Sequence, residues 1–407
     1  MMGEATKVAV IGAGPGGLVA AREAAKRGID VTVFEEDSEV GVPCHCAGLL
    51  SLDGLKEIQV PLDDVFIQNR VRGARFFSPS KLPFAIERKE PVACAVNRSC
   101  LDKFLAAQAV DAGAILRLNS RVRRIRWVSG RISIVGDFGR VKADVVIDAE
   151  GVLSRLIKQV GLRPLQAQHL LPAFQCELTG TQIDRDYVEI HTGRELAPEF
   201  FAWVIPLSGD SARIGLACKG ASPREKLKMF IKDRFKGENV DRIRSYSGLV
   251  VTSGPISKTF NDNFIAVGDV AGQVKPTTGG GVIWGGMCAM IAGETAAEAV
   301  EAKALSGDFL ANYETRWRRR LGNEVRLTLL ARRTIDNLSD GTIDRIFEIV
   351  RKSNLHLELS AEGKMDFQAA SILRLMTNMA ILRVLASSIG DLKEAIIAYI
   401  RDHSILC

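Results

Sequence analysis

Residues 7–36 read KVAVIGAGPGGLVAAREAAKRGIDVTVFEE, and this stretch decides the fold. It combines a hydrophobic strand, a turn with three spaced glycines, an alanine-rich helix and a second strand that ends at Glu35. Gly12 permits a sharp turn, Gly14 lets the backbone approach a pyrophosphate, and Gly17 lets helix and strand pack closely. The helix N-terminus offers free N–H groups to the phosphates. Glu35 is placed to accept hydrogen bonds from ribose hydroxyls, so the stretch predicts a dinucleotide-binding βαβ unit.

Length and composition indicate a protein of two or three domains. The chain has 407 residues, of which 47% are hydrophobic and 25% are charged, and a formal net charge of +6. This length exceeds the size at which a single core stops growing. The modest positive charge suits an anionic cofactor or a lipid surface, and without a basic and aromatic stripe it predicts no nucleic-acid partner.

The cysteines and the apolar segments indicate where the protein works. Eight cysteines are scattered without CxxC pairs, which favours a reducing compartment and argues against structural zinc or an iron–sulfur cluster, so no metal is expected. No signal peptide is visible before the glycine motif. The uncharged stretch 276–293 contains six glycines, which favours a buried loop and helix over a membrane span. We therefore expect a cytoplasmic protein, with peripheral membrane contact as a possible addition.

The order of strand and helix patterns predicts an interleaved α/β architecture. Strand–glycine landmarks recur at residues 7–35, 144–154 and 264–293, while alternating strands occupy 172–253. We expect a Rossmann-like cofactor domain, an antiparallel-sheet substrate domain and a helical C-terminal region. The expected bounds are 1–70, 98–170 and 254–305 for the first, 71–97 and 171–253 for the second, and 306–407 for the third.

A second glycine loop narrows the cofactor. Asp269 follows a buried strand, at the sheet edge where ligands bind in open α/β folds, and can bond a ribityl or ribose hydroxyl. The run from Gly279 to Gly281 opens a helix whose N–H groups can stabilise the negative charge of a reduced flavin ring. The loop therefore favours FAD; the alternative is a loop that only caps the helix.

Further polar and glycine positions fit the same cofactor. Arg98 and Asp102 are four residues apart on one helical face, so Arg98 can reach a pyrophosphate or ribityl oxygen or can form a surface ion pair. Asp148 and Gly151 close a strand and let the backbone approach the cofactor. Val122 ends the segment AILRLNSRV, where a backbone amide and carbonyl can pair with an adenine edge.

Two segments are candidates for the reaction site. Cys46 lies in the loop GVPCHCAG, either as a small packed residue or close to a flavin ring and substrate. In PEFFAWVIP, residues 198–206, strand alternation places Phe201, Trp203 and Ile205 on one face, either as the wall of an apolar tunnel or as ordinary sheet core. The cluster RWRRR at 316–320 can rest against anionic lipid or form a solvated basic face.

Together these motifs resemble the FAD-dependent geranylgeranyl reductases, in particular the archaeal digeranylgeranylglycerophospholipid reductases, within the p-hydroxybenzoate hydroxylase-like flavoproteins. The strand at 198–206 is similar to the family motif P-x-x-Y-x-W-x-F-P, with Phe201 in place of Tyr and Ile205 in place of Phe. The resemblance implies that Cys46 lies close to the isoalloxazine ring. The residues predicted to bind FAD are Gly12, Gly14, Gly16, Gly17, Glu35, Cys46, Ala47, Arg98, Val122, Asp148, Gly151, Asp269, Gly280, Gly281 and Val282.

The resemblance implies saturation of alkene bonds in geranylgeranyl chains of isoprenoid membrane lipids, with hydride from reduced FAD and a proton from Cys46 or a flavin-bound water. A second GxGxxG is absent, so the electrons are expected from a ferredoxin or from transiently bound NAD(P)H. Two alternatives share the cofactor motifs or the fold: an FAD-dependent aromatic monooxygenase and a non-catalytic prenyl-binding protein.

Overall fold

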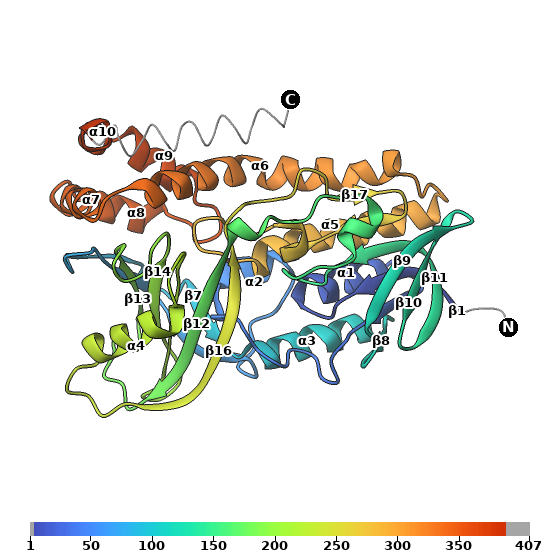
Figure 1. Cartoon of the computed structure of the whole chain (residues 1–407), viewed down its shortest axis with the longest axis horizontal. Coiled ribbons are helices and arrows are strands. Elements are labelled where there is room, and N and C mark those ends of the chain that lie inside the picture. The colour runs from blue at the N-terminus through green and yellow to red at the C-terminus, as the bar shows by residue number, and fades with distance from the viewer. Residues whose placement is uncertain (1–3, 388–407) are drawn as a thin grey trace.

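The structure is a computed structural model that describes residues 4–387. Residues 1–3 and 388–407, which include the end of the predicted C-terminal region, lie outside the described residues. In Figure 1 one large sheet lies at the right, a second lies at the left, and the C-terminal helices run along the top. The predicted α/β class is confirmed.

The sheet at the right has a parallel core that carries the glycine motif. Its parallel strands lie in the order β8 (Ile115–Arg117), β2 (Val31–Phe34), β1 (Glu4–Ile11), β11 (Gly139–Asp148) and β18 (Phe264–Ala266). Three antiparallel strands complete it: β17 (Phe260–Asn261) pairs with β18, and the hairpin β9 (Val122–Val128) and β10 (Arg131–Gly136) pairs with β11. Because central parallel strands are covered on both faces, β1 is hydrophobic at successive positions.

Helices cover one face of this sheet. Val8 and Val10 of β1 pack in one core with α1 (Pro15–Ala25), α3 (Arg98–Asp111) and α5 (Val282–Glu301). Ala9 and Ile11 face the opposite side, where residues of the β9–β10 hairpin and the segment 156–162 form a separate core. The carboxyl ends of β1, β11 and β18 therefore meet beside the starts of α1 and α5.

The sheet at the left, called the cap sheet below, is built mainly from the segments that the sequence assigns to the cap domain. Its order is β16 (Asp241–Val251), β12 (Leu170–Thr179), β15 (Ala212–Ala217), β14 (Phe201–Pro206), β13 (Tyr187–Thr192), β5 (Gly73–Phe77) and β6 (Pro83–Glu87). All neighbours are antiparallel except β13 and β5, which pair in parallel. Helix α4 (Pro223–Arg234) is capped by the hydroxyl of Ser222, the residue before it, and covers the outer face.

A small sheet and the C-terminal helices complete the described chain. The small sheet has the order β3 (Leu49–Ser51), β7 (Ala93–Val96) and β4 (Ile67–Val71). Helix α2 (Leu52–Glu57) follows β3 directly in the sequence. Of the predicted cap segment 71–97, β5 and β6 therefore join the large left-hand sheet, while β7 joins the small one. The remaining helices are α6 (Gly307–Asn337), α7 (Asp340–Lys352), α8 (Leu355–Glu362), α9 (Ala369–Thr377) and α10 (Met379–Ser387).

The stretch 276–293 forms the loop and helix that its glycines predict, and most of its helical part is buried. Within residues 4–387, no single helix is long and apolar enough to cross a membrane. The pair α9 and α10, bent by 73°, reaches the required length and composition only when both helices are taken together.

Candidate active site

The glycine turn after β1 is shaped by close backbone contacts. Gly12 has φ +97°, and a Cβ there would lie 2.5 Å from the carbonyl oxygen of Ala149. A Cβ on Gly17 would overlap the carbonyl oxygen of Gly12. Both glycines are therefore needed for the turn itself, because it is squeezed between the start of α1 and the end of β11.

Gly14 differs from these two because its Cβ position is open. A Cβ there would meet no atom within 4 Å, and the same holds for Gly16 apart from the Cα of Gly268 at 4.0 Å. Gly14 is the N-cap of α1 and supplies no side-chain acceptor to the first turn. Open space in front of free helix-end N–H groups is the cradle that a pyrophosphate requires.

Glu35 lies beside this turn at the end of β2. Its Oε2 accepts a hydrogen bond from the amide of Ala13 at 2.6 Å, and Oε1 accepts one from the amide of Asp37 at 3.0 Å. These bonds hold the carboxylate against the glycine turn and leave further lone pairs for ribose hydroxyls. Val122 packs in the same core as Phe34, the residue before Glu35.

The end of β11 forms a polar turn. Asp148 is fully buried, and its carboxylate accepts a hydrogen bond from the amide of Glu150 at 3.1 Å. Burial and the charge of Glu150 raise the pKa of Asp148 well above its ordinary value. Gly151 has φ +83° and open space at its Cβ position. The buried carboxylate of Asp148 thus holds the backbone of the turn in place, and the absence of a side chain at Gly151 leaves the space beside the turn open.

The start of α5 presents a second set of unpaired groups. Helix α5 begins at Val282 after Gly281, which provides no side-chain cap. The carboxylate of Asp269 lies against Gly281, where a Cβ would overlap Oδ1. Within residues 4–387, no hydrogen bond to that carboxylate is found. Desolvation by the surrounding protein raises its pKa, and the positive charge of Arg98 opposes the shift.

Arg98 is the first residue of α3 and forms an ion pair within that helix. Its guanidinium forms a two-pronged ion pair with Asp102, at 3.1 and 3.0 Å. Burial lowers the pKa of Arg98, but Asp102, Cys46 and Cys44 together raise it above its ordinary value. Arg98 therefore lies within electrostatic reach of Cys46. It also acts on the pKa of Asp269, so its charge reaches the loop before α5.

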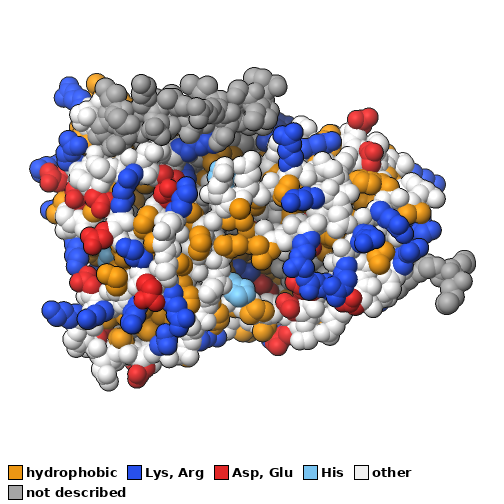
Figure 2. Space-filling view, viewed as in Figure 1, with side chains coloured by type: hydrophobic (Ala, Val, Ile, Leu, Met, Phe, Trp, Pro, Cys, Tyr) orange, Lys and Arg blue, Asp and Glu red, His pale blue; other side chains and the backbone are white. Residues whose placement is uncertain are grey.

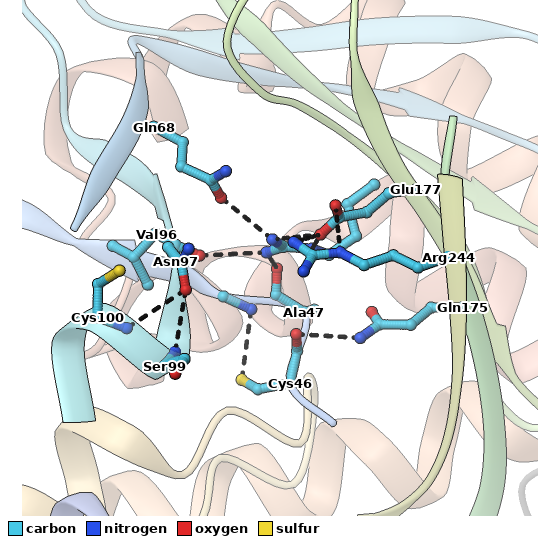
Figure 3. A network of polar contacts seen from close by, with 12 residues as sticks. Cys46, Ala47, Gln68, Val96, Asn97, Ser99, Cys100, Gln175, Glu177 and Arg244 are labelled. Atoms are coloured by element: carbon cyan, nitrogen blue, oxygen red, sulfur yellow. Dashed lines mark hydrogen bonds and ion pairs between the residues drawn. The ribbon is translucent and has the colours of Figure 1, made fainter. Parts of the chain in front are cut away.

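The Cys46 loop is bound to the cap sheet by buried polar side chains, as Figure 3 shows. Gln175 of β12 donates to the carbonyl oxygen of Cys46 at 3.0 Å, and Arg213 of β15 donates to that of Ala47 at 2.7 Å. The thiol of Cys46 accepts a bond from the amide of Gly48 at 3.3 Å. The loop is therefore fixed at the boundary between the two large sheets.

Strand β14 lies beside this boundary, and Phe201, Trp203 and Ile205 share one of its faces, as strand alternation predicts. Trp203 and Ile205 belong to a buried apolar cluster, and Phe201 and Ala47 pack against it. Ala202 and Val204 instead face α4 in another core. The indole of Trp203 lies against Gly215 of β15, where any Cβ would overlap the ring. The predicted cofactor loop and the predicted substrate strand thus share one apolar surface.

Comparison with known proteins identifies the family. The family model described as lycopene cyclase protein matches residues 7–357. The chain is 34% identical over 355 residues to digeranylgeranylglycerophospholipid reductase 2 of Methanothermobacter thermautotrophicus, covering 86% of this chain and 92% of that one. It is 31% identical to the digeranylgeranylglycerophospholipid reductase of Methanocaldococcus jannaschii, covering 85% and 90%. The chain belongs to the digeranylgeranylglycerophospholipid reductase family.

Solved structures agree with this assignment. A geranylgeranyl bacteriochlorophyll reductase-like protein from Thermoplasma acidophilum superposes with a TM-score of 0.86 at 27% identity, over 95% of this chain and 99% of that one. A flavin-dependent brominase, at 18% identity and TM-score 0.69, shares the fold over 96% of this chain. The open Gly14 cradle, Glu35 and the uncapped α5 fit FAD, and the chain is an FAD-dependent oxidoreductase.

Several residues of the site escape sequence reasoning. Arg213 and Gln175 lie in strands that read as sheet core, and only their polarity among apolar neighbours singles them out. Lys275 of the glycine loop forms a buried ion pair with Asp366 at 2.7 Å, and Asp366 also accepts a bond from Ser51. Because Asp366 follows in sequence by 91 residues, no local pattern predicts this pairing.

The cluster at 316–320, for which the sequence leaves lipid contact and a solvated basic face as alternatives, forms most of its contacts within the protein. Trp317 is buried and donates to Thr259 at 3.1 Å. Three of the arginines form ion pairs: Arg316 with Glu294 and Glu298, Arg318 with Glu314, and Arg320 with Glu57.

Proposed function

We propose that this protein saturates alkene bonds of geranylgeranyl chains in archaeal-type membrane lipids. The observation that carries the proposal is the shared apolar cluster: Ala47 of the cofactor loop packs against the same cluster as Trp203 and Ile205. A prenyl chain has no polar group to bond, so a dry apolar wall beside the cofactor loop suits it. The reductases named above belong to the same family as this chain, and their names describe reduction of such lipids.

The residues present divide the work of the reaction. When bound, reduced FAD supplies the hydride. Phe201, Trp203 and Ile205 form the apolar wall that excludes water and holds the alkene in place, which matters because an isolated alkene accepts hydride poorly. Glu35 and the glycine turn hold the ribose and the pyrophosphate of the cofactor.

The thiol of Cys46 is the proposed proton donor. Its S–H proton passes to the second alkene carbon, and solvent later returns a proton to the thiolate. Arg98 supports this role because its guanidinium lies within electrostatic reach of the Cys46 sulfur. Replacement of Cys46 by Ser is expected to slow alkene reduction by roughly a hundredfold while FAD stays bound.

The test is anaerobic. Protein reduced with dithionite is mixed with a geranylgeranylated glycerophospholipid, and the lipid is analysed by mass spectrometry. We expect the lipid to gain two hydrogen atoms for each double bond reduced. An unchanged lipid, with the flavin still bound and reduced, would falsify the proposal.

The electron donor and a membrane contact belong to the same proposal. Lys and Arg side chains gather on the right of the face in Figure 2, over the β9–β10 hairpin and the start of β11, where Arg124, Arg126 and Arg140 are exposed. This patch favours an acidic protein donor such as a ferredoxin over NAD(P)H. Reduction rates with ferredoxin should fall in Arg124→Glu and Arg126→Glu, while rates with dithionite should not change.

Because the substrate lipid resides in a bilayer, we also expect peripheral binding from the cytoplasmic side. Co-sedimentation of the protein with vesicles of anionic isoprenoid lipid tests this expectation. Protein that stays in the supernatant with such vesicles, at low ionic strength, contradicts it.

A further inference from the structure

Arg213 is a buried cation that joins four segments of the chain. Its side chain is 3% exposed. It donates five hydrogen bonds: to Glu177 from Nε at 3.0 Å and from Nη2 at 2.8 Å, to Gln68 from Nη2 at 3.2 Å, and from Nη1 to the carbonyl oxygens of Ala47 at 2.7 Å and Val96 at 3.3 Å. A guanidinium has five N–H donors, so this group is fully satisfied.

The two carbonyl acceptors belong to the candidate site. Ala47 follows Cys46 directly, and Val96 precedes Asn97, whose side chain caps the helix that begins with Arg98. The loop backbone passes close over the guanidinium, because a Cβ on Gly48 would lie 2.5 Å from Nη1. One side chain therefore holds the Cys46 loop and the start of α3 together.

The same side chain is anchored to the substrate strand. In the sheet, Arg213 pairs directly with Ile205 of β14. Its charge is compensated by Glu177 of β12, which also accepts two bonds from Arg244, at 2.7 and 3.0 Å. Arg244 is 47% exposed and contacts neither the loop nor α3 by a hydrogen bond within the described residues.

We propose that Arg213 is a positioning residue that fixes the Cys46 loop, and with it the thiol, against the strand that carries Trp203 and Ile205. Residues 41–48 have no helix or strand of their own, so their position depends on bonds of this kind. The inference rests on the proposed function for its meaning, since the loop lies between cofactor and prenyl chain. A lysine could keep the charge but could not make the forked set of bonds.

The experiment measures how accessible the Cys46 thiol is in the FAD-loaded protein. Iodoacetamide labels the protein over a range of pH values, and peptide mass spectrometry follows Cys46 separately from the other cysteines. In Arg213→Lys, loss of charge-assisted bonds to the loop should raise the labelling rate of Cys46 by roughly tenfold and shift its pH profile. Arg244→Lys is the matched control, because it shares Glu177 but does not bond the loop, and it should leave the rate unchanged.

A second variant keeps the test decisive if Arg213→Lys does not fold. Gln175→Leu removes only the bond to the carbonyl oxygen of Cys46, and it should also raise Cys46 labelling. Unchanged labelling in the folded variants, or an equal rise in Arg244→Lys, overturns the proposal. Labelling needs no lipid and no reductant, so a failure of alkene reduction in the wild type would count against the proposed function and leave this result standing.

Discussion

Glycines of one motif have different tasks at the scale of single residues. Gly17 is required by the fold, since a Cβ would overlap the carbonyl oxygen of Gly12. Gly14 is not, because its Cβ position is open and its φ of −74° suits any residue. The open position is where the phosphates of the cofactor would lie.

Alanine at these two positions should therefore separate stability from cofactor binding. Gly14→Ala is expected to keep the melting temperature of the apoprotein and to weaken FAD binding at least tenfold, because its methyl group occupies the phosphate cradle. Gly17→Ala is expected to lower stability by about 1–3 kcal/mol or more through overpacking. Flavin fluorescence titration and thermal unfolding measure the two effects, and a Gly14→Ala variant with wild-type affinity would refute the assignment.

At this scale the sequence predicts what a fixed motif spacing encodes. Gly12, Gly17 and Glu35 have positions set by local geometry, and the structure places Glu35 at the turn as the spacing indicates. Arg213 and Asp366 act through partners far away in the sequence, so their roles depend on tertiary packing that no local pattern contains.

Strands and helices show the same division at the scale of elements. The alternation of β14 can be predicted from the sequence because the two faces of the strand pack into two different apolar cores. Strand β16 cannot be predicted in this way, because most of its residues are exposed and its sequence lacks alternating hydrophobic positions. The parallel pairing of β13 with β5 joins segments more than a hundred residues apart, beyond the reach of local turn signals.

Between β13 and α4, the carboxylate of Glu189 makes stability depend on pH. Burial alone would raise its pKa, but hydrogen bonds from Arg234 and His191 lower it to about 2. A pKa lower in the folded than in the unfolded state stabilises the fold above the unfolded value of 4.5, and this stabilisation is lost as the pH falls toward about 2.

Glu189→Gln should therefore lower the free energy of unfolding at pH 7 by up to about 3 kcal/mol and by much less near pH 3. Urea denaturation at both pH values measures the difference. Glu195→Gln, at an exposed position, serves as the control. A loss in Glu189→Gln that is equal at both pH values would contradict this explanation.

At the scale of the whole molecule, buried polar bonds hold the C-terminal region against the glycine loop that contains Lys275. The segment around Asp366 bonds Lys275, Ser51 and the indole of Trp284, and Met365 packs against the cluster that contains Trp203. Lys275 and Asp366 are both buried, so neither charge can be solvated if the other is removed.

Asp366→Asn is accordingly expected to destabilise the protein by about 3–5 kcal/mol, because Lys275 is left as a buried, uncompensated charge. Exchanging both residues, as Lys275→Met with Asp366→Leu, should recover much of the loss. Asp53→Asn, which breaks the exposed pair with Lys56, is the control and should cost less than about 1 kcal/mol. Chemical denaturation compares the variants, and equal stability of Asp366→Asn and Asp53→Asn would refute this role of the buried pair.

The central claim is that electrons pass from reduced FAD to a prenyl alkene at the junction of the two large sheets. The most direct measurement is an anaerobic single turnover, in which the oxidised-flavin absorbance of pre-reduced protein is followed after mixing with the geranylgeranylated lipid. We predict that this absorbance returns with the lipid, does not return with the fully saturated lipid, and returns much more slowly in Cys46→Ser. A flavin that stays reduced with the unsaturated lipid, or that reoxidises equally with the saturated one, would contradict the claim.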